Sequence, residues 1–196
     1  MHIILFGGTF DPPHLAHTQM VQQLLDQQLA DEVWYVPVGS QHTKHFTDKK
    51  MTAIEHRLAM LKLILVPRTK VETFEVTSGK PSHTDLTLRS LRAQHPQHTF
   101  SWLIGSDQLA KLHLWIQEDG SPTFPSILKE FDFYVYPRAG YPMALPHPQL
   151  KAVEGVAPMP DSSTEIRRRI KAGESITGLV DSQVEEYIID KKLYQS

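Results

Sequence analysis

Apolar residues along the chain follow two spacings, one typical of buried β-strands and one typical of amphipathic helices. Short apolar or alternating runs predict strands at residues 2–6, 33–36, 71–76, 100–104, 133–136 and 151–156. Apolar residues three and four positions apart predict helices at residues 15–29, 52–65, 84–94, 162–172 and 182–191. Strands that alternate with helices favour a parallel sheet covered on both faces. The pattern therefore predicts an α/β fold, a Rossmann-like, doubly wound and mainly parallel sheet with helices on both faces.

Length and composition narrow the class of protein. The 196 residues predict a single domain over residues 1–196 with a full hydrophobic core. A formal net charge of −2 gives no bulk attraction to nucleic acids or membranes, and neither is expected as a partner. The absence of cysteine excludes disulfides and thiolate chemistry, and with no signal peptide in view it predicts a cytoplasmic location.

The most informative stretch is residues 7–17, directly after the first predicted strand. It opens with Gly7 and Gly8, which allow the backbone to approach a ligand closely. His14 and His17 follow, three positions apart where a helix begins, which places both imidazoles on one face of the first turn. A strand, a glycine turn, two donors and a helix N-terminus together predict an anion site, most naturally for phosphate.

Two other interpretations of this stretch stay open. The glycines could tighten the turn and leave His14 and His17 as surface residues. The histidines could also bind a metal, but a zinc site needs three or four protein ligands and no further ligand pair lies nearby in the sequence. We therefore predict no protein-bound metal.

A second motif lies at the start of the helix predicted at residues 162–172. Ser162 and Glu165 have the spacing of a capping box. Arg167 falls four residues after Ser163, on the face of the cap hydroxyls, and is the arginine expected to contact phosphate. Arg169 can pair with Glu165 four residues earlier, and Arg168 is expected to be a solvated charge.

At these residues the sequence resembles a known family. Residues 7–17 resemble the nucleotidyltransferase signature that contains the T/H-x-G-H element, and residues 163–167 resemble its C-terminal partner. The segments 82–88, 103–107 with Trp115, and 138–142, together with the basic loop ending at Lys44, resemble the bacterial nicotinate-nucleotide adenylyltransferase family. The resemblance covers residues 4–194. Neither a P-loop nor a G-x-G-x-x-G fingerprint is present.

The resemblance implies transfer of AMP from ATP to nicotinate mononucleotide, giving deamido-NAD and pyrophosphate, with Mg²⁺ held mainly by the ATP phosphates. It implies four residues that contact phosphates during catalysis: His14, His17, Lys44 and Arg167. It implies an ATP subsite of Gly7, Gly8, Thr9, Phe10, Gly105, Asp107, Ser163 and Thr164. It implies that the nicotinate nucleotide contacts Thr84, Trp115 and Arg138. A homo-oligomer is left open.

The chain departs from the family pattern at Ala16, His83 and Asp161, and in extra length at residues 117–125. Two alternatives follow. One is a related adenylyltransferase with another acceptor, such as nicotinamide mononucleotide or phosphopantetheine. The other is a nucleotide-binding sensor that keeps the fold without turnover.

Overall fold

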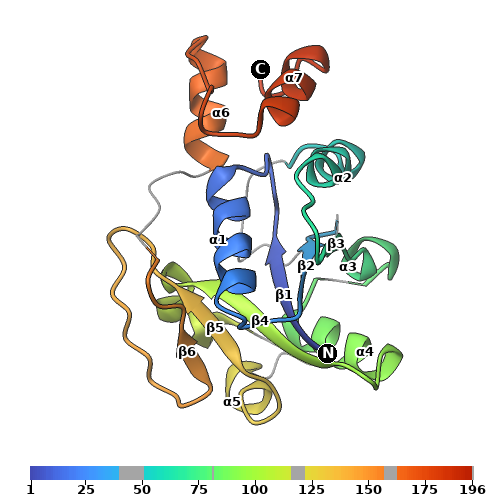
Figure 1. Cartoon of the computed structure of the whole chain (residues 1–196), viewed down its shortest axis with the longest axis vertical. Coiled ribbons are helices and arrows are strands. Elements are labelled where there is room, and N and C mark those ends of the chain that lie inside the picture. The colour runs from blue at the N-terminus through green and yellow to red at the C-terminus, as the bar shows by residue number, and fades with distance from the viewer. Residues whose placement is uncertain (40–50, 81, 116–121, 157–162, 196) are drawn as a thin grey trace.

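One sheet of six parallel strands organises the molecule, in the order β3-β2-β1-β4-β5-β6 (Figure 1). The computed structural model describes residues 1–39, 51–80, 82–115, 122–156 and 163–195. The strands are β1 (His2–Gly8), β2 (Glu32–Pro37), β3 (Thr69–Val71), β4 (Thr99–Gly105), β5 (Phe133–Tyr136) and β6 (Leu150–Ala152). This all-parallel order confirms the predicted doubly wound fold, because each strand must be joined to its parallel neighbour by a crossover.

Helices cover both faces of the sheet, and two lie beyond its carboxyl end (Figure 1). They are α1 (Leu15–Asp26), α2 (Ile54–Leu63), α3 (Phe74–Thr77), α4 (Thr84–Gln94), the 3₁₀ helix η1 (Ser106–Leu114), α5 (Phe124–Ile127), α6 (Ser163–Ala172) and α7 (Ser182–Asp190). No helix in the described part of the chain has the length and apolar character needed to cross a membrane.

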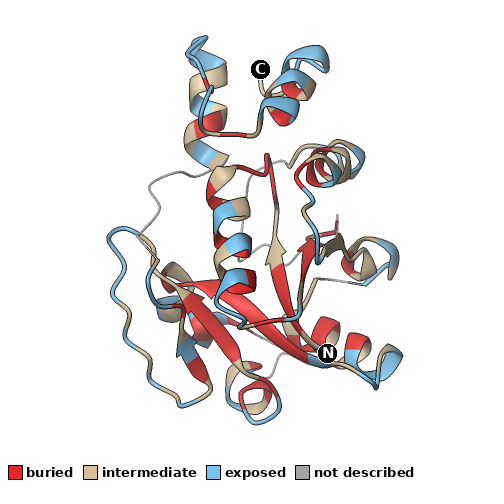
Figure 2. Ribbon diagram, in the orientation of Figure 1, coloured by how far each residue is buried: buried red, intermediate tan, exposed pale blue. Residues whose placement is uncertain are grey.

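The alternation of side chains along β1 divides the core into two parts. Ile4 and Phe6 point to the face covered by α1, α2, α6 and α7. Ile3 and Leu5 point to the opposite face, where α4, η1 and α5 pack. Strand residues are therefore buried on both sides, as the red sheet in Figure 2 shows. This is why the strands appear in the sequence as nearly continuous apolar runs.

Three predicted elements need correction. The alternating stretch 71–76 is not a strand: β3 ends at Val71, and residues 74–77 form α3. The strand predicted at 151–156 is the shorter β6. The helix predicted over 15–29 ends at Asp26, where Gln27 caps it. The 3₁₀ helix after β4 and the short α5 had no counterpart in the predictions.

The sheet order fixes where a ligand site can form. The chain leaves β1 toward β2 on one side and returns to β4 on the other, so the order reverses between β1 and β4. In open parallel sheets, ligands bind at the carboxyl ends of the strands at such a reversal. Gly8 and Gly105 end these two strands.

Candidate active site at the carboxyl ends of the strands

A cavity of about 680 Å³ lies at this reversal point. The residues predicted for substrate contact that line it are Gly7, Gly8, Thr9, His14, His17, Thr84, Gly105, Asp107, Trp115, Arg138, Ser163, Thr164 and Arg167. They come from six separate segments of the chain. Phe10 is not among the lining residues, and Lys44 lies outside the described residues. The structure thus brings together in one cavity the glycine–histidine stretch, the start of α4, the end of β4 and the start of α6.

The glycines that end β1 are needed for packing. A Cβ atom at Gly7 would overlap the indole ring of Trp102, which lies on the neighbouring strand β4. A Cβ atom at Gly8 would stand 3.0 Å from the Phe10 ring. Phe10 itself is buried and packs edge-on against Phe6, so its side chain belongs to the core. The rings of Trp102 and Phe10 therefore occupy the space that a side chain at Gly7 or Gly8 would need.

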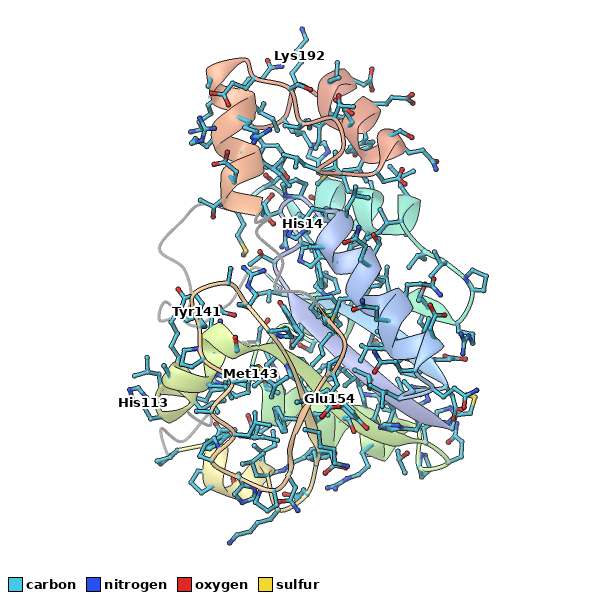
Figure 3. All side chains as sticks on the ribbon, turned by 60° about the vertical axis from the view of Figure 1, so that its left-hand side comes forward. His14, His113, Tyr141, Met143, Glu154 and Lys192 are labelled. Atoms are coloured by element: carbon cyan, nitrogen blue, oxygen red, sulfur yellow. The ribbon has the colours of Figure 1, made fainter. Side chains whose placement is uncertain are left out.

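His14 and His17 lie together at the N-terminus of α1, the end that faces the C-terminal helices in Figure 3. Their rings stack with centroids 3.7 Å apart. The backbone N–H of His14 donates to Nδ1 of His17 at 3.1 Å. Because Nδ1 of His17 accepts, a neutral His17 must have its proton on Nε2. His17 is therefore fixed in the tautomer that makes Nε2 a donor.

Both histidines are neutral at pH 7. Burial, with the nearby positive charge of Arg138, lowers the pKa of His14 to about 4. Burial, followed by the proximity of His14 and Arg138, holds the pKa of His17 well below its usual range. Nδ1 of His14 is buried and has no hydrogen-bond partner within the described residues. These rings are thus suited to donate a neutral N–H.

The lowered pKa of His14 makes stability dependent on pH. In the unfolded chain His14 takes up a proton near pH 6.5, whereas in the folded protein it does so near pH 4. The unfolded state therefore binds more protons between these values, and stability falls as the pH falls. We expect His14 alone to lower the free energy of unfolding by about 2 kcal/mol between pH 7 and pH 5.

Urea denaturation of the wild type and of His14→Asn at both pH values measures this effect. The variant is expected to lose about 2 kcal/mol less than the wild type over the same interval. Equal losses in the two proteins would show that His14 titrates normally in the folded state.

The start of α6 is attached to the loop that follows β1. Ser163 donates from Oγ to the backbone carbonyl of Pro12 at 2.9 Å, and Arg167 donates from Nη1 to the backbone carbonyl of Asp11. Arg167 also donates from Nη2 to Oγ1 of Thr164 at 3.2 Å. The two sequence motifs, about 150 residues apart in the chain, are thus in direct contact at one edge of the cavity.

The other arginines of α6 form ion pairs on its surface. Arg169 pairs with Glu165 at 3.0 Å, as the spacing predicts. Arg168 is not simply solvated, because it pairs with Glu165 and Glu174, each at 2.8 Å. Ser162, the other half of the predicted capping box, lies outside the described residues, as does Asp161.

The opposite side of the cavity is formed by α4 and the end of β4. Thr84 is the first residue of α4, and His83 is its N-cap. Trp115 is buried and packs against Phe133 at 6.1 Å, so only part of its indole faces the cavity. Asp107 lies 3.7 Å from Nε of Arg138. Each predicted acceptor residue therefore borders the same cavity as the histidines.

Several lining residues were not predicted from the sequence. They are Glu75, Ser82, Trp102, Gln108, Lys111 and Tyr136. Two neighbouring glycines, Gly39 and Gly105, have backbone so close to other atoms that a Cβ atom would overlap Glu75 and Asp107, respectively. Gly105 was already predicted, and Gly39, two residues beyond the end of β2, is the sequence signal that could have drawn attention to Glu75.

Within the described residues, no group of three or more histidine, aspartate or glutamate side chains is placed to hold a metal ion. Asp107 follows the last residue of β4. Its carboxylate accepts a hydrogen bond from Nε2 of Gln108 at 2.8 Å and forms an ion pair with Arg138.

Comparison with known proteins agrees with this geometry. The model of the cytidylyltransferase-like family matches residues 5–169. A nicotinate-nucleotide adenylyltransferase of Bacillus subtilis is 33% identical over 194 residues, covering 98% of this chain and 97% of that protein. The probable nicotinate-nucleotide adenylyltransferase of Lactiplantibacillus plantarum is 36% identical, covering 97% of this chain and 87% of its own length.

A solved structure supports the fold independently. The Plasmodium falciparum nicotinic acid mononucleotide adenylyltransferase complexed with NaAD superposes with a TM-score of 0.79 at 21% identity, covering 98% of this chain and 97% of that one. The parallel sheet, together with the family model that matches residues 5–169, defines an α/β nucleotidyltransferase. Within that class, the chain belongs to the nicotinate-nucleotide adenylyltransferase family.

Proposed function

We propose that this enzyme transfers AMP from ATP to the 5′-phosphate of nicotinate mononucleotide, giving deamido-NAD and pyrophosphate. The observation that supports this most directly is that one cavity is lined both by His14, His17 and Arg167 and by Thr84 at the start of α4. The first group suits a triphosphate, and the second suits an acidic acceptor.

In the proposed reaction, a phosphate oxygen of the acceptor attacks the α-phosphorus of ATP. A new P–O bond forms, the bond between the α-phosphorus and the bridging oxygen breaks, and pyrophosphate leaves with the bonding electrons. The second pKa of a phosphate monoester is near ~6, so the nucleophile is already ionised at pH 7. No general base is needed, and the task of the protein is to position two anions and to neutralise charge.

The residues at the phosphate end fit that task. Nε2–H of His17 is fixed as a donor by the hydrogen bond at Nδ1. His14 stacks on His17, and Arg167 adds a positive charge from α6. Lys44, from the segment outside the described residues, is proposed to contact a phosphate as well. Mg²⁺ bound to the ATP phosphates would supply further charge neutralisation and improve the leaving group.

The adenosine end of ATP is proposed to lie along the strand ends. Gly7, Gly8 and Thr9 offer backbone contacts where β1 ends, with Phe10 following in the same loop. Gly105 and Asp107 lie beside them at the end of β4, and the Asp107 carboxylate can accept from ribose hydroxyls. Ser163 and Thr164 at the start of α6 close the site.

The acceptor is proposed to bind across α4 and η1. Backbone N–H groups in the first turn of a helix lack intrahelical partners, so those near Thr84 can bind the nicotinate carboxylate. The exposed part of the Trp115 indole offers a stacking surface for the pyridine ring, and Arg138 a charge for the phosphate. A carboxylate requires only donors, whereas a carboxamide also requires an acceptor.

We therefore expect nicotinate mononucleotide to be the better substrate. A carboxamide would turn its own N–H donors toward those of α4, so kcat/KM should be at least about tenfold lower for nicotinamide mononucleotide. Pyrophosphate release with ATP and either acceptor, with phosphopantetheine as a third, measures this preference.

The same measurement separates the alternatives. Equal turnover of the acid and amide forms would contradict the assignment of the acceptor subsite. Turnover of phosphopantetheine alone would indicate the related adenylyltransferase, and absence of pyrophosphate release with every acceptor would indicate a nucleotide sensor. The cytoplasmic location and the homo-oligomer stay predictions.

A further inference from the structure

Glu75 is a buried acid that the proposed chemistry does not use. It lies on α3 with 6% of its surface exposed and lines the cavity beside Ser82 and Thr84. No lysine or arginine among the described residues forms an ion pair with it. A buried carboxylate without a cation is costly, so such a group normally keeps its proton.

The hydrogen-bond network around Glu75 can hold a proton on its carboxyl group. Oγ1 of Thr87 lies 2.8 Å from Oε1 of Glu75 and 3.1 Å from the backbone carbonyl of His83. One hydroxyl has one proton and cannot donate fully to both. Both contacts are satisfied when Glu75 donates to Thr87 and Thr87 donates to His83. Burial raises the pKa of Glu75 and outweighs the hydrogen bonds from Ser82 and Thr87 and the nearby His83, which lower it.

A second hydroxyl completes the network. Oγ of Ser82 accepts from the backbone N–H of Gly39 at 3.1 Å, which leaves its own proton for Glu75. Glu75 therefore connects the segment after β2 with His83, the N-cap of α4. The backbone of Gly39 lies so close to the Glu75 carbonyl that a Cβ atom would overlap it. The Glu75 carboxyl group is thus one of the links between the first turn of α4 and the segment after β2.

We propose that Glu75 is a positioning residue of the acceptor subsite, a neutral carboxylic acid that presents the first-turn N–H groups of α4 to the carboxylate of the acceptor. This inference rests on the proposed function. Neutrality matters because an ionised Glu75 would compete for the positive end of α4 and would repel an anionic ring substituent.

Steady-state kinetics of Glu75→Ala and Glu75→Gln test the proposal. Glu75→Ala should raise KM for nicotinate mononucleotide about tenfold, with kcat and KM for ATP changed less than about twofold. Glu75→Gln should restore KM to within about twofold of the wild type, because an amide can donate to Thr87 and accept from Ser82. Glu72→Ala is the matched control: Glu72 accepts from the N–H of Phe74 at 3.1 Å and does not line the cavity, so no KM should change.

Four outcomes would overturn the inference. Glu75→Gln as impaired as Glu75→Ala would show that an ionised carboxylate is required. An unchanged KM for nicotinate mononucleotide in Glu75→Ala would show that the residue does not position the acceptor. An equal rise in KM for ATP would show a general effect on the fold. A wild type that does not turn over nicotinate mononucleotide would overturn the proposed function and this inference with it.

Thr87→Val provides a second route should Glu75→Ala not fold. It keeps the shape of the side chain and removes only the hydroxyl that links Glu75 to His83. The same selective rise in KM for nicotinate mononucleotide is expected. Its absence would contradict the proposed link from Glu75 through Thr87 to His83.

Discussion

Replacing His17 with alanine is expected to lower kcat by about 10²–10³, with a modest change in KM for ATP, because one preorganised donor to the transition state is lost. Three observations support this. The ring is held by the N–H of His14, which fixes Nε2 as the donor. The ring lines the cavity, and burial with neighbouring positive charge keeps its pKa low. A neutral donor binds ground-state ATP weakly and gains strength as charge develops on the oxygens around the α-phosphorus.

Single-turnover and steady-state rates of pyrophosphate release measure the effect. The matched control is His95→Ala, which removes a histidine that contacts Trp34 and does not line the cavity, so kcat should stay within about twofold. A drop in ATP affinity equal to the drop in rate would assign His17 to ground-state binding. Normal turnover would exclude a transition-state role.

The residues of the phosphate end follow from local motifs at the end of a strand or the start of a helix, whereas the acceptor residues Thr84, Trp115 and Arg138 were implied only by the resemblance to the family. Gly7 and Gly8 follow the first apolar run, and Ser163 opens a helix. Parallel strands bring their carboxyl ends to one edge, so these local motifs had to meet. The side-chain contacts across that edge, such as that of Ser163 with Pro12, were not predicted and come from the structure.

The stretch 71–76 shows why local pattern fails where partners are distant. Its alternation of apolar and polar residues suits a strand. In the structure only Thr69–Val71 pair with a neighbouring strand. The helix α3 then begins at Phe74, whose N–H donates to the side chain of Glu72. β2 itself continues to Pro37, beyond its last paired residue Tyr35, so the pairing ends where the chain turns into α3, and this competition between strand and helix is not visible in the alternating pattern.

Buried ionisable residues were missed for a related reason. Glu75 and Arg57 occupy positions that a helical or alternating pattern treats as solvent-facing. Arg57 has 1% of its surface exposed and Glu75 has 6%, because backbone carbonyls and hydroxyls from other segments surround them. Such partners are far away in the sequence, so hydropathy alone predicts the wrong side for these residues.

Arg57 is expected to be the most costly of these residues to remove. Its guanidinium donates to three backbone carbonyls: Nη1 to Thr9 at 2.9 Å, Nη2 to Val38 at 2.9 Å, and Nε to Thr52 at 3.1 Å. It thereby connects the end of β1, the end of β2 and the start of α2. Arg57→Met keeps the apolar stem and removes all five N–H donors, which leaves three part-buried carbonyls without their guanidinium donor. We expect a loss of about 3–5 kcal/mol in the free energy of unfolding.

Urea denaturation with activity measured on the folded protein separates stability from function. Arg57→Lys should recover less than half of the loss, because one ammonium group cannot direct donors at three carbonyls in different segments. Arg92→Met is the control: Arg92 is exposed and pairs with Glu130 at 2.6 Å, so this substitution should cost less than about 1 kcal/mol.

Since Thr9 and Val38 line the cavity, a folded Arg57→Met protein should also bind ATP more weakly. A variant as stable as the wild type would mean that water can replace the guanidinium at these carbonyls, and that the strand ends are held in place by the sheet alone.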